Sequence, residues 1–360
     1  MRKTTTSNLT YHIIGGGIAG LFCAQILKIK SPKAKVVVYE ANSQLGGRCY
    51  SYQDKEFGLN LDNATHVIIG ANKYLKRFVL PNEWEPDIGF WDAKTNSVSY
   101  QYKANLEHIM KSACNLEAEK IAPEIRKKIL RSTFPWGYNQ RKIYFSKQNL
   151  SQRIINNLAS FPDKIICNCK LKKIESQFGN AAQLVFNNCQ VELGGQDKVL
   201  LALDNQSCSK LLGEASLPHS SIINIFYQTS EKIYLPKNAS VIGVIKGVAD
   251  WFFVNNNILG ATISSANNQN TALPDLARMV WQELDGLRGV NSAFIPPFRA
   301  FKHKYATIMQ DEYTNSLRPD DALTSYPNVF IAGDWTMKNH PCCMETAYLS
   351  AKRAAKIMLK

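Results

Sequence analysis

This 360-residue chain lacks most of the sequence features that mark membrane, secreted or repeat proteins. No window contains the ~18 to 20 uncharged apolar residues that a membrane-spanning helix needs. The N-terminal segment 1–7 carries two basic residues but no apolar core, which argues against a secretory signal and favours a cytoplasmic location. A repeat and a low-complexity linker are both lacking. With 45% hydrophobic and 20% charged residues, the composition is that of a folded chain, long enough for two domains.

The cysteines show no disulfide framework. Nine of them, an odd number, suit a reducing compartment. Cys167 and Cys169 are too close together for the usual zinc knuckle, and no second pair or histidine supports one, so we interpret them as buried thiols. The sequence therefore predicts no metal site.

The formal charge of +14 has no single explanation. No nucleic-acid module accompanies the charge, and the lysines are scattered, so nucleic acid is the least favoured partner. The chain is rich in Asn and Ile, which favours compositional bias of the source genome. Attraction to an anionic membrane surface is the other explanation, and it would make the protein peripheral on the inner face of the cell membrane.

Segment 11–21 predicts a dinucleotide-binding turn. A short apolar strand precedes three glycines, Gly15, Gly17 and Gly20, and a helical pattern follows them. The first glycine allows a tight turn, the second lets the backbone approach a pyrophosphate, and the third lets the helix pack on the strand. The helix N-terminus then directs unpaired N–H groups and a positive dipole end at the phosphates.

The acidic residue expected of this motif is present. A second apolar strand, Lys35–Tyr39, ends in Glu40, twenty residues after Gly20, where a carboxylate can accept both ribose hydroxyl protons. A glycine pair, Gly46 and Gly47, follows with Arg48, which predicts a second flexible backbone beside the dinucleotide and a guanidinium for its phosphates. Taken alone, that pair would indicate only a surface turn.

The other end of the chain predicts residues at the same crevice. A buried strand at 328–332 leads into Gly333 and Asp334, and ligands of open α/β sheets lie beyond the carboxyl ends of the strands. A helix over 344–359 follows, with small residues on one face that allow close approach to a cofactor. Taken alone, the strand and helix could equally well close a domain.

Together these blocks resemble the flavin-dependent amine oxidase and phytoene desaturase superfamily, most closely its hydroxysqualene dehydroxylases, the squalene-associated FAD-dependent desaturases. The blocks that carry the resemblance are residues 13–21, 39–52, 61–75, 251–256, 303–308, 317–319 and 332–347. Three residues depart from the family pattern: Cys342, Cys343 and Thr346. The chain is also shorter than the family leads us to expect.

The resemblance implies non-covalent FAD and an α/β fold, in which a three-layer Rossmann-like FAD-binding domain carries an inserted α+β substrate domain. We expect 1–65, 160–205 and 325–360 to form the FAD domain, and 66–159 and 206–324 the substrate domain. The residues it implies as FAD contacts are Gly15, Gly17, Ile18, Ala19, Gly20, Glu40, Ala41, Gly46, Gly47, Arg48, Gly333, Asp334 and Glu345. Among them, Glu40 would hold the adenosine ribose, Arg48 would lie by the pyrophosphate and Asp334 by the ribityl and phosphate region.

The middle of the chain contains aromatic clusters at 134–138 and 251–253 and a basic amphipathic segment at 123–131. The clusters would be walls of a tunnel for a polyprenyl chain or ordinary core. The basic segment would lie on a membrane surface or expose a solvated helix face.

The activity that the resemblance implies is reductive dehydroxylation of hydroxysqualene to squalene, with an apolar isoprenoid as substrate and squalene-synthase-like proteins as pathway partners. His66 is the candidate general acid and Asp62 its orienting group. Alternatively, Asp62 orders a loop and His66 packs against FAD, and His340 is a second candidate acid. Rival readings are a carotenoid or phytoene desaturase, an amine oxidase, and a degenerate FAD-binding homologue without activity.

Overall fold

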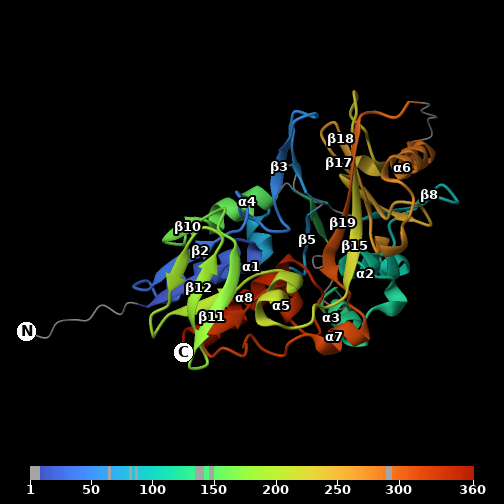
Figure 1. Ribbon diagram of the computed structural model, residues 1–360. Helices are drawn as coiled ribbons and strands as arrows, with labels where there is room; N and C mark the ends of the chain where they lie inside the picture. Colours follow the sequence, from blue (N-terminus) through green and yellow to red (C-terminus); the bar gives the residue numbers. More distant parts are fainter. Residues whose placement is uncertain are drawn as a thin grey trace, which may run out of the picture. The chain divides into compact units, whose positions relative to one another are not determined.

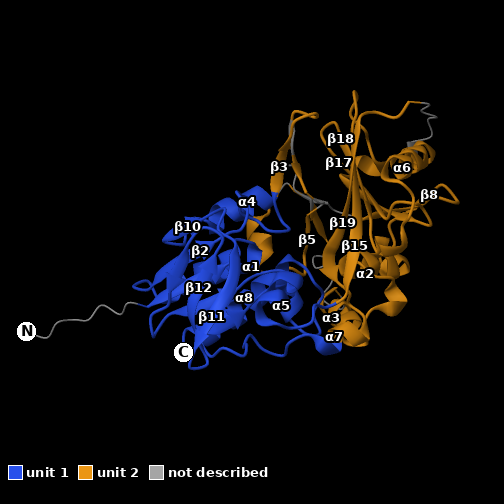
Figure 2. Ribbon diagram, in the orientation of Figure 1, with its two compact units in different colours: residues 1–50, 151–217, 316–360 blue, residues 51–150, 218–315 orange. Residues whose placement is uncertain are grey.

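The computed structural model describes residues 9–63, 66–80, 83–85, 88–133, 142–145, 150–288 and 294–360 (Figure 1). Within these ranges the chain divides into two compact units, coloured separately in Figure 2. Unit 1 comprises 1–50, 151–217 and 316–360, and unit 2 comprises 51–150 and 218–315. No helix among the described residues is both long and apolar enough to cross a membrane.

These limits differ from the expected domain limits at 65, 160, 205 and 325 by between 9 and 15 residues. The largest difference has a clear cause. Strands β3 (Ser51–Asp54) and β4 (Leu59–Asp62) pair as an antiparallel hairpin, and the ion pair of Asp54 with Arg299 ties that hairpin to unit 2.

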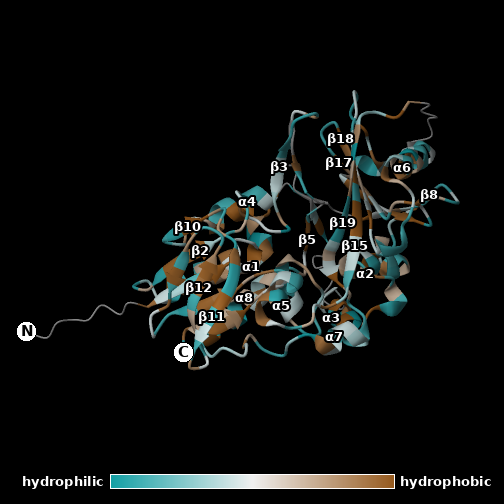
Figure 3. Ribbon diagram, viewed as in Figure 1, coloured by the Kyte–Doolittle hydropathy of each residue, from teal (hydrophilic) through white to brown (hydrophobic). Residues whose placement is uncertain are grey.

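Unit 1 is built on a parallel sheet with the strand order β10-β2-β1-β14-β20. In chain order its strands are β1 (Thr10–Ile14), β2 (Lys35–Tyr39), β10 (Lys164–Ile166), β14 (Lys198–Leu201) and β20 (Val329–Ile331). Three segments far apart in the sequence thus form one sheet. Strands β2, β14 and β20 are nearly continuous apolar runs, as expected where both faces are covered, and the ribbon at the β2 label in Figure 3 is largely brown.

Helices cover one face of this sheet and a small antiparallel sheet covers the other, so unit 1 has three layers. On the helical face, the Tyr11 side chain forms a hydrogen bond with Ser31 at the end of α1. On the other face, the Tyr39 ring stacks on that of Phe186 in β12, with ring centroids 4.6 Å apart. The elements outside the parallel sheet are α1 (Ile18–Lys30), α4 (Leu150–Leu158), β11 (Leu171–Gln177), β12 (Asn180–Phe186), β13 (Gln190–Glu192), α5 (Asn205–Leu212) and α8 (Met344–Met358). This is the three-layer Rossmann-like domain that the sequence predicts.

Unit 2 is organised around a largely antiparallel sheet with the order β19-β15-β18-β17-β16-β7-β8, in which only β16 and β7 pair in parallel. Its strands are β7 (Gly89–Asp92), β8 (Ser97–Ser99), β15 (His219–Gln228), β16 (Val241–Ile245), β17 (Trp251–Asn255), β18 (Ile258–Ile263) and β19 (Phe298–Ile308). The remaining elements are β5 (Val67–Ile69), β6 (Trp84–Glu85), α2 (Leu106–Cys114), α3 (Pro123–Thr133), β9 (Ile143–Phe145), α6 (Leu273–Arg288) and α7 (Glu312–Leu317), which crosses the unit boundary.

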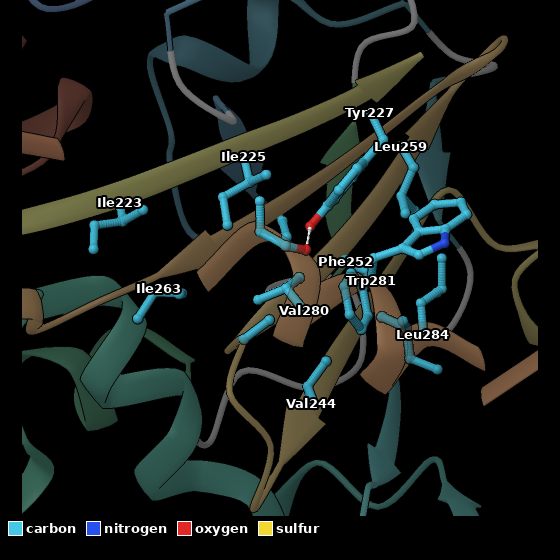
Figure 4. Packing of buried hydrophobic residues seen from close by; sticks show 14 of the residues in the cluster. Ile223, Ile225, Tyr227, Val244, Phe252, Leu259, Ile263, Val280, Trp281 and Leu284 are labelled. Atoms are coloured by element: carbon cyan, nitrogen blue, oxygen red, sulfur yellow. Dashed lines mark hydrogen bonds between the residues drawn. The ribbon is translucent and has the colours of Figure 1, made fainter. Parts of the chain in front are cut away.

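The core of unit 2 lies between this sheet and α6 (Figure 4). Tyr227 and Trp281 pack there with ring centroids 5.1 Å apart, and the Tyr227 hydroxyl donates to the Ala277 carbonyl at 2.6 Å. Of the aromatic cluster at 251–253, Phe252 and Phe253 are buried in hydrophobic clusters, so they are ordinary core. The cluster at 134–138 lies outside the described residues.

Candidate FAD-binding site

The glycine turn after β1 has the geometry that its spacing predicts. Gly15 has φ +107°, its amide donates to the Tyr39 carbonyl at 2.8 Å, and a Cβ on it would lie 2.4 Å from the Ala202 carbonyl oxygen. A Cβ on Gly20 would lie 2.0 Å from the Gly15 carbonyl oxygen. Packing within the chain therefore requires both of these residues to be glycine.

Gly17 is different, because none of the described residues around it requires it to be glycine. Its φ is −79°, which any residue adopts, and a Cβ on it would come no closer than 3.8 Å to protein. It occupies the N-cap position of α1, whose first helical bond runs from the Leu21 amide to the Gly17 carbonyl, so the amides before Leu21 lie outside the helical ladder. Open space beside such amides is what a pyrophosphate needs, so this turn fits the dinucleotide.

The second glycine pair lies beside the first turn. Gly46 and Gly17 form a parallel bridge, and the Gly46 amide donates to the Gly16 carbonyl at 2.9 Å. Both Gly46 (φ +120°) and Gly47 (φ +61°) have left-handed backbone. The two glycine-rich segments thus form one backbone cradle.

Glu40 has a structural contact that the sequence did not indicate. The carboxylate is buried, and its Oε2 accepts a hydrogen bond from the Gly16 amide at 2.8 Å. Its Oε1 accepts from the amide and side chain of Asn42 at 2.9 and 3.0 Å. Glu40 therefore fixes the glycine turn, and Oε2, which accepts only the Gly16 amide, keeps a second lone pair that can accept a ribose hydroxyl.

Arg48 and Asp334, 286 residues apart, form an ion pair. Arg48 Nη2 lies 2.5 Å from Asp334 Oδ1, and the Asp334 carboxylate is buried whereas the Arg48 side chain is about half exposed. The Trp335 amide also donates to Asp334 Oδ1, at 3.0 Å. The structure thus joins the two ends of the chain at the residues that the sequence places at one crevice.

Arg318 holds the segment after β20, a role that the sequence analysis missed. Its side chain is buried, with 2% of its area exposed. Nε donates to the Trp335 carbonyl at 2.9 Å, Nη1 to that of His340 at 2.8 Å, and Nη2 to that of Asp334 at 2.7 Å. Residues 317–319 belong to the family resemblance, but an arginine before a proline does not by itself indicate that its side chain binds three backbone carbonyls.

Helix α8 begins beside the same segment. The Ser350 hydroxyl on this helix accepts a hydrogen bond from the Gly333 amide, with N and Oγ 3.0 Å apart, which fixes the end of β20 against the helix. Glu345 lies in its first turn. Cys342 is buried, which raises the pKa of its thiol to about 12, and burial also raises the pKa of the Cys343 thiol. Both cysteines are therefore protonated at neutral pH.

The candidate catalytic residues fall in different units. Asp62 and His66 are together in unit 2, where His66 Nδ1 lies 3.6 Å from Asp62 Oδ2 and Asp62 Oδ1 accepts a bond from the Ser51 hydroxyl. His340 is in unit 1, and its Nδ1 lies 2.9 Å from the Lys338 carbonyl oxygen. Asp62 is thus in contact with its predicted partner.

Comparison with known proteins agrees with this geometry. The model of the NAD(P)-binding Rossmann-like domain matches residues 13–80, and the model of the flavin containing amine oxidoreductases matches residues 138–359, more than half of the chain. The chain belongs to the flavin-containing amine oxidoreductase family. The family resemblance stated from the sequence is confirmed, and this member is an FAD-dependent oxidoreductase.

Similar proteins cover nearly its whole length. A hydroxysqualene dehydroxylase from Zymomonas mobilis is 27% identical, and one from Sinorhizobium fredii is 22% identical; each match covers 97% of this chain and 98% of the relative. Among solved structures, an oxidoreductase from Methanosarcina mazei superposes with a TM-score of 0.74 at 14% identity, covering 98% of this chain and 100% of the other. The last likeness establishes the fold alone.

Proposed function

We propose that this flavoenzyme converts hydroxysqualene to squalene by reductive dehydroxylation. The observation that carries the proposal is the extent of the similarity to hydroxysqualene dehydroxylases, which covers 97% of the chain and so includes unit 2 as well as the glycine turns. Matches confined to the nucleotide-binding segments would support a flavoprotein of any activity.

In this proposal unit 1 holds FAD. The amides at the start of α1 and the backbone of Gly46 and Gly47 bind the pyrophosphate, with Arg48 as its cationic partner. Glu40 would hold the adenosine ribose through the lone pair of Oε2 that the Gly16 amide does not use. The same cradle includes Ile18 and Ala19 at the start of the helix and Ala41 after Glu40.

The C-terminal segment would hold the rest of the cofactor. Asp334, buried and held by Arg318 through its backbone, would lie by the ribityl and phosphate region. The N-terminal turn of α8, with Glu345, would direct N–H groups and a positive dipole end at the pyrimidine edge of the flavin. These contacts fix the orientation of the cofactor.

Reduced flavin supplies the hydride. In the overall reaction the carbon–oxygen bond of the allylic alcohol would be replaced by a carbon–hydrogen bond, and the hydroxyl would leave as water with one added proton. His66 donates the proton, and Asp62 orients its ring and stabilises the imidazolium that precedes donation. Unit 2 binds the isoprenoid chain.

The test uses purified holoenzyme. We expect a yellow protein that releases FAD on heat denaturation and, when reduced anaerobically, forms squalene from hydroxysqualene. Oxidised enzyme is incubated in parallel with squalene and with phytoene. Desaturated products in those incubations, or hydrogen peroxide formed from simple amines, would overturn the proposal. The variant Gly195→Ala serves as a matched control, because a Cβ on that exposed glycine meets no atom within 4 Å.

A further inference from the structure

His303 on β19 carries a buried polar atom whose partner is missing. Its Nε2 is shielded from solvent and has no hydrogen-bond partner in the part of the chain that the structure describes. A bond between the ring and the backbone of Asn63 acts to raise its pKa, so the ring donates that bond, and Nδ1 is the nitrogen left to make it. Buried polar atoms are nearly always paired, so an orphaned one indicates a ligand or water.

The neighbouring residues on β19 show what His303 faces. Arg299, Phe301 and His303 pair in regular register with alternate residues of β15, so their side chains project from the same face. On that face Arg299 Nε lies 3.2 Å from Asp54 Oδ2, and the Phe301 ring lies 6.4 Å from that of Tyr52. The face therefore runs along the β3–β4 hairpin, and His303 meets its end at Asn63.

A bulge begins just after this histidine. Between the pairs His303–Ile222 and Thr307–Ser220, β19 advances four residues while β15 advances two. Bulges redirect side chains and are frequent next to active sites. The bulge ends the regular face at His303.

The surroundings combine apolar surface with polar groups. Phe301 lies 6.5 Å from the His303 ring, and 36% of its area is exposed. Asp62, which pairs with His66, precedes Asn63 in the chain. The imidazole thus lies between the partly exposed ring of Phe301 and the backbone of Asn63, which follows Asp62 in the chain.

We propose that Nε2 of His303 accepts a hydrogen bond from the hydroxyl group of an isoprenoid alcohol, while Phe301 and Tyr52 contact the adjoining hydrocarbon. This inference rests on the proposed function for its substrate class. Burial lowers the pKa of His303, which keeps the ring neutral, and donation from Nδ1 to Asn63 places the lone pair on Nε2. His303 is then a residue that positions the departing hydroxyl, distinct from the group that protonates it.

The experiment compares two ligands that differ by the hydroxyl group. Oxidised holoenzyme, which lacks the hydride for turnover, is titrated with hydroxysqualene and with squalene, and binding is followed by the flavin absorbance. In His303→Phe we expect the dissociation constant for hydroxysqualene to rise about tenfold or more, the value of one hydrogen bond to a buried group, and that for squalene to change less than about twofold. His303→Gln, which keeps a polar end, should recover part of the loss.

Controls separate this inference from a loss of fold. His303→Leu gives the same comparison if His303→Phe does not fold, and His219→Phe removes an imidazole from the adjacent strand β15. Equal weakening of both ligands, or unchanged binding of hydroxysqualene because Nε2 bonds only water, would overturn the inference while leaving the activity in place. Wild-type enzyme that neither binds nor converts hydroxysqualene would overturn both it and the proposed function.

Discussion

Gly17→Ala should separate cofactor binding from folding. A Cβ at this position comes no closer than 3.8 Å to protein, and the backbone conformation suits alanine. Two small effects on the apoprotein oppose each other: alanine is a poorer N-cap than glycine, whereas it lowers the entropy of the unfolded chain by about 0.4–1 kcal/mol. We therefore expect the free energy of unfolding of the apoprotein to change by less than about 1 kcal/mol.

The effect of Gly17→Ala on the affinity for FAD should be much larger. The added methyl group would occupy the space beside the amides at the start of α1 and hold the pyrophosphate away from them. Loss of one hydrogen bond from an amide to a charged oxygen costs about 1.5–3 kcal/mol, so the dissociation constant should rise about 10- to 150-fold. The dissociation constant is measured by titrating FAD into the apoprotein and following the quenching of flavin fluorescence.

A matched pair of variants makes this test decisive. Gly20→Ala places a Cβ 2.0 Å from the Gly15 carbonyl oxygen, so it should destabilise the apoprotein by about 1–3 kcal/mol, as overpacking does. Gly195→Ala should alter neither quantity. Urea unfolding of the apoproteins gives the stabilities. The reasoning is refuted if Gly17→Ala binds FAD like wild type, or if it destabilises the apoprotein as much as Gly20→Ala does.

Three further predictions concern other parts of the chain. Arg318→Met should lower the free energy of unfolding by about 3 kcal/mol or more, because three carbonyls lose their partner; urea unfolding that matches wild type would contradict this. Cys189, which is exposed, should react with a thiol reagent well before buried Cys23 in native protein, and equal rates would refute the packing. Burial lowers the pKa of His12 and His108 from 6.5, so the unfolded chain binds more protons below that pH; stability should fall between pH 7 and 5, and a rise there would contradict the assignment.

The sequence was most informative where a local pattern dictates backbone geometry. The strand before Gly15, the helix after Gly17 and the strand before Glu40 are present as β1, α1 and β2. Apolar periodicity and glycine spacing act over a few residues, so they can be read without knowing the fold.

Bonds between distant side chains and backbone could not be predicted in this way. The sequence indicated Glu40 for a ribose, but not that its carboxylate also holds the Gly16 amide. Residues 303–308 belong to the family resemblance, yet their sequence does not indicate that Nε2 of His303 is buried without a hydrogen-bond partner among the described residues. The compact units divide at residue 50 and not at the expected limit of 65, because the β3–β4 hairpin pairs through Asp54 with Arg299, more than two hundred residues later.

The sequence by itself determined the glycine turn, the strands around it and the family to which the chain belongs, because these follow from short patterns of residues. Only the tertiary structure decided that Arg48 pairs with Asp334 and that Arg318 holds the segment after β20. It also decided that the face of His303 runs along the β3–β4 hairpin. These contacts join residues from separate parts of the chain, and their geometry exists only once the sheets have formed.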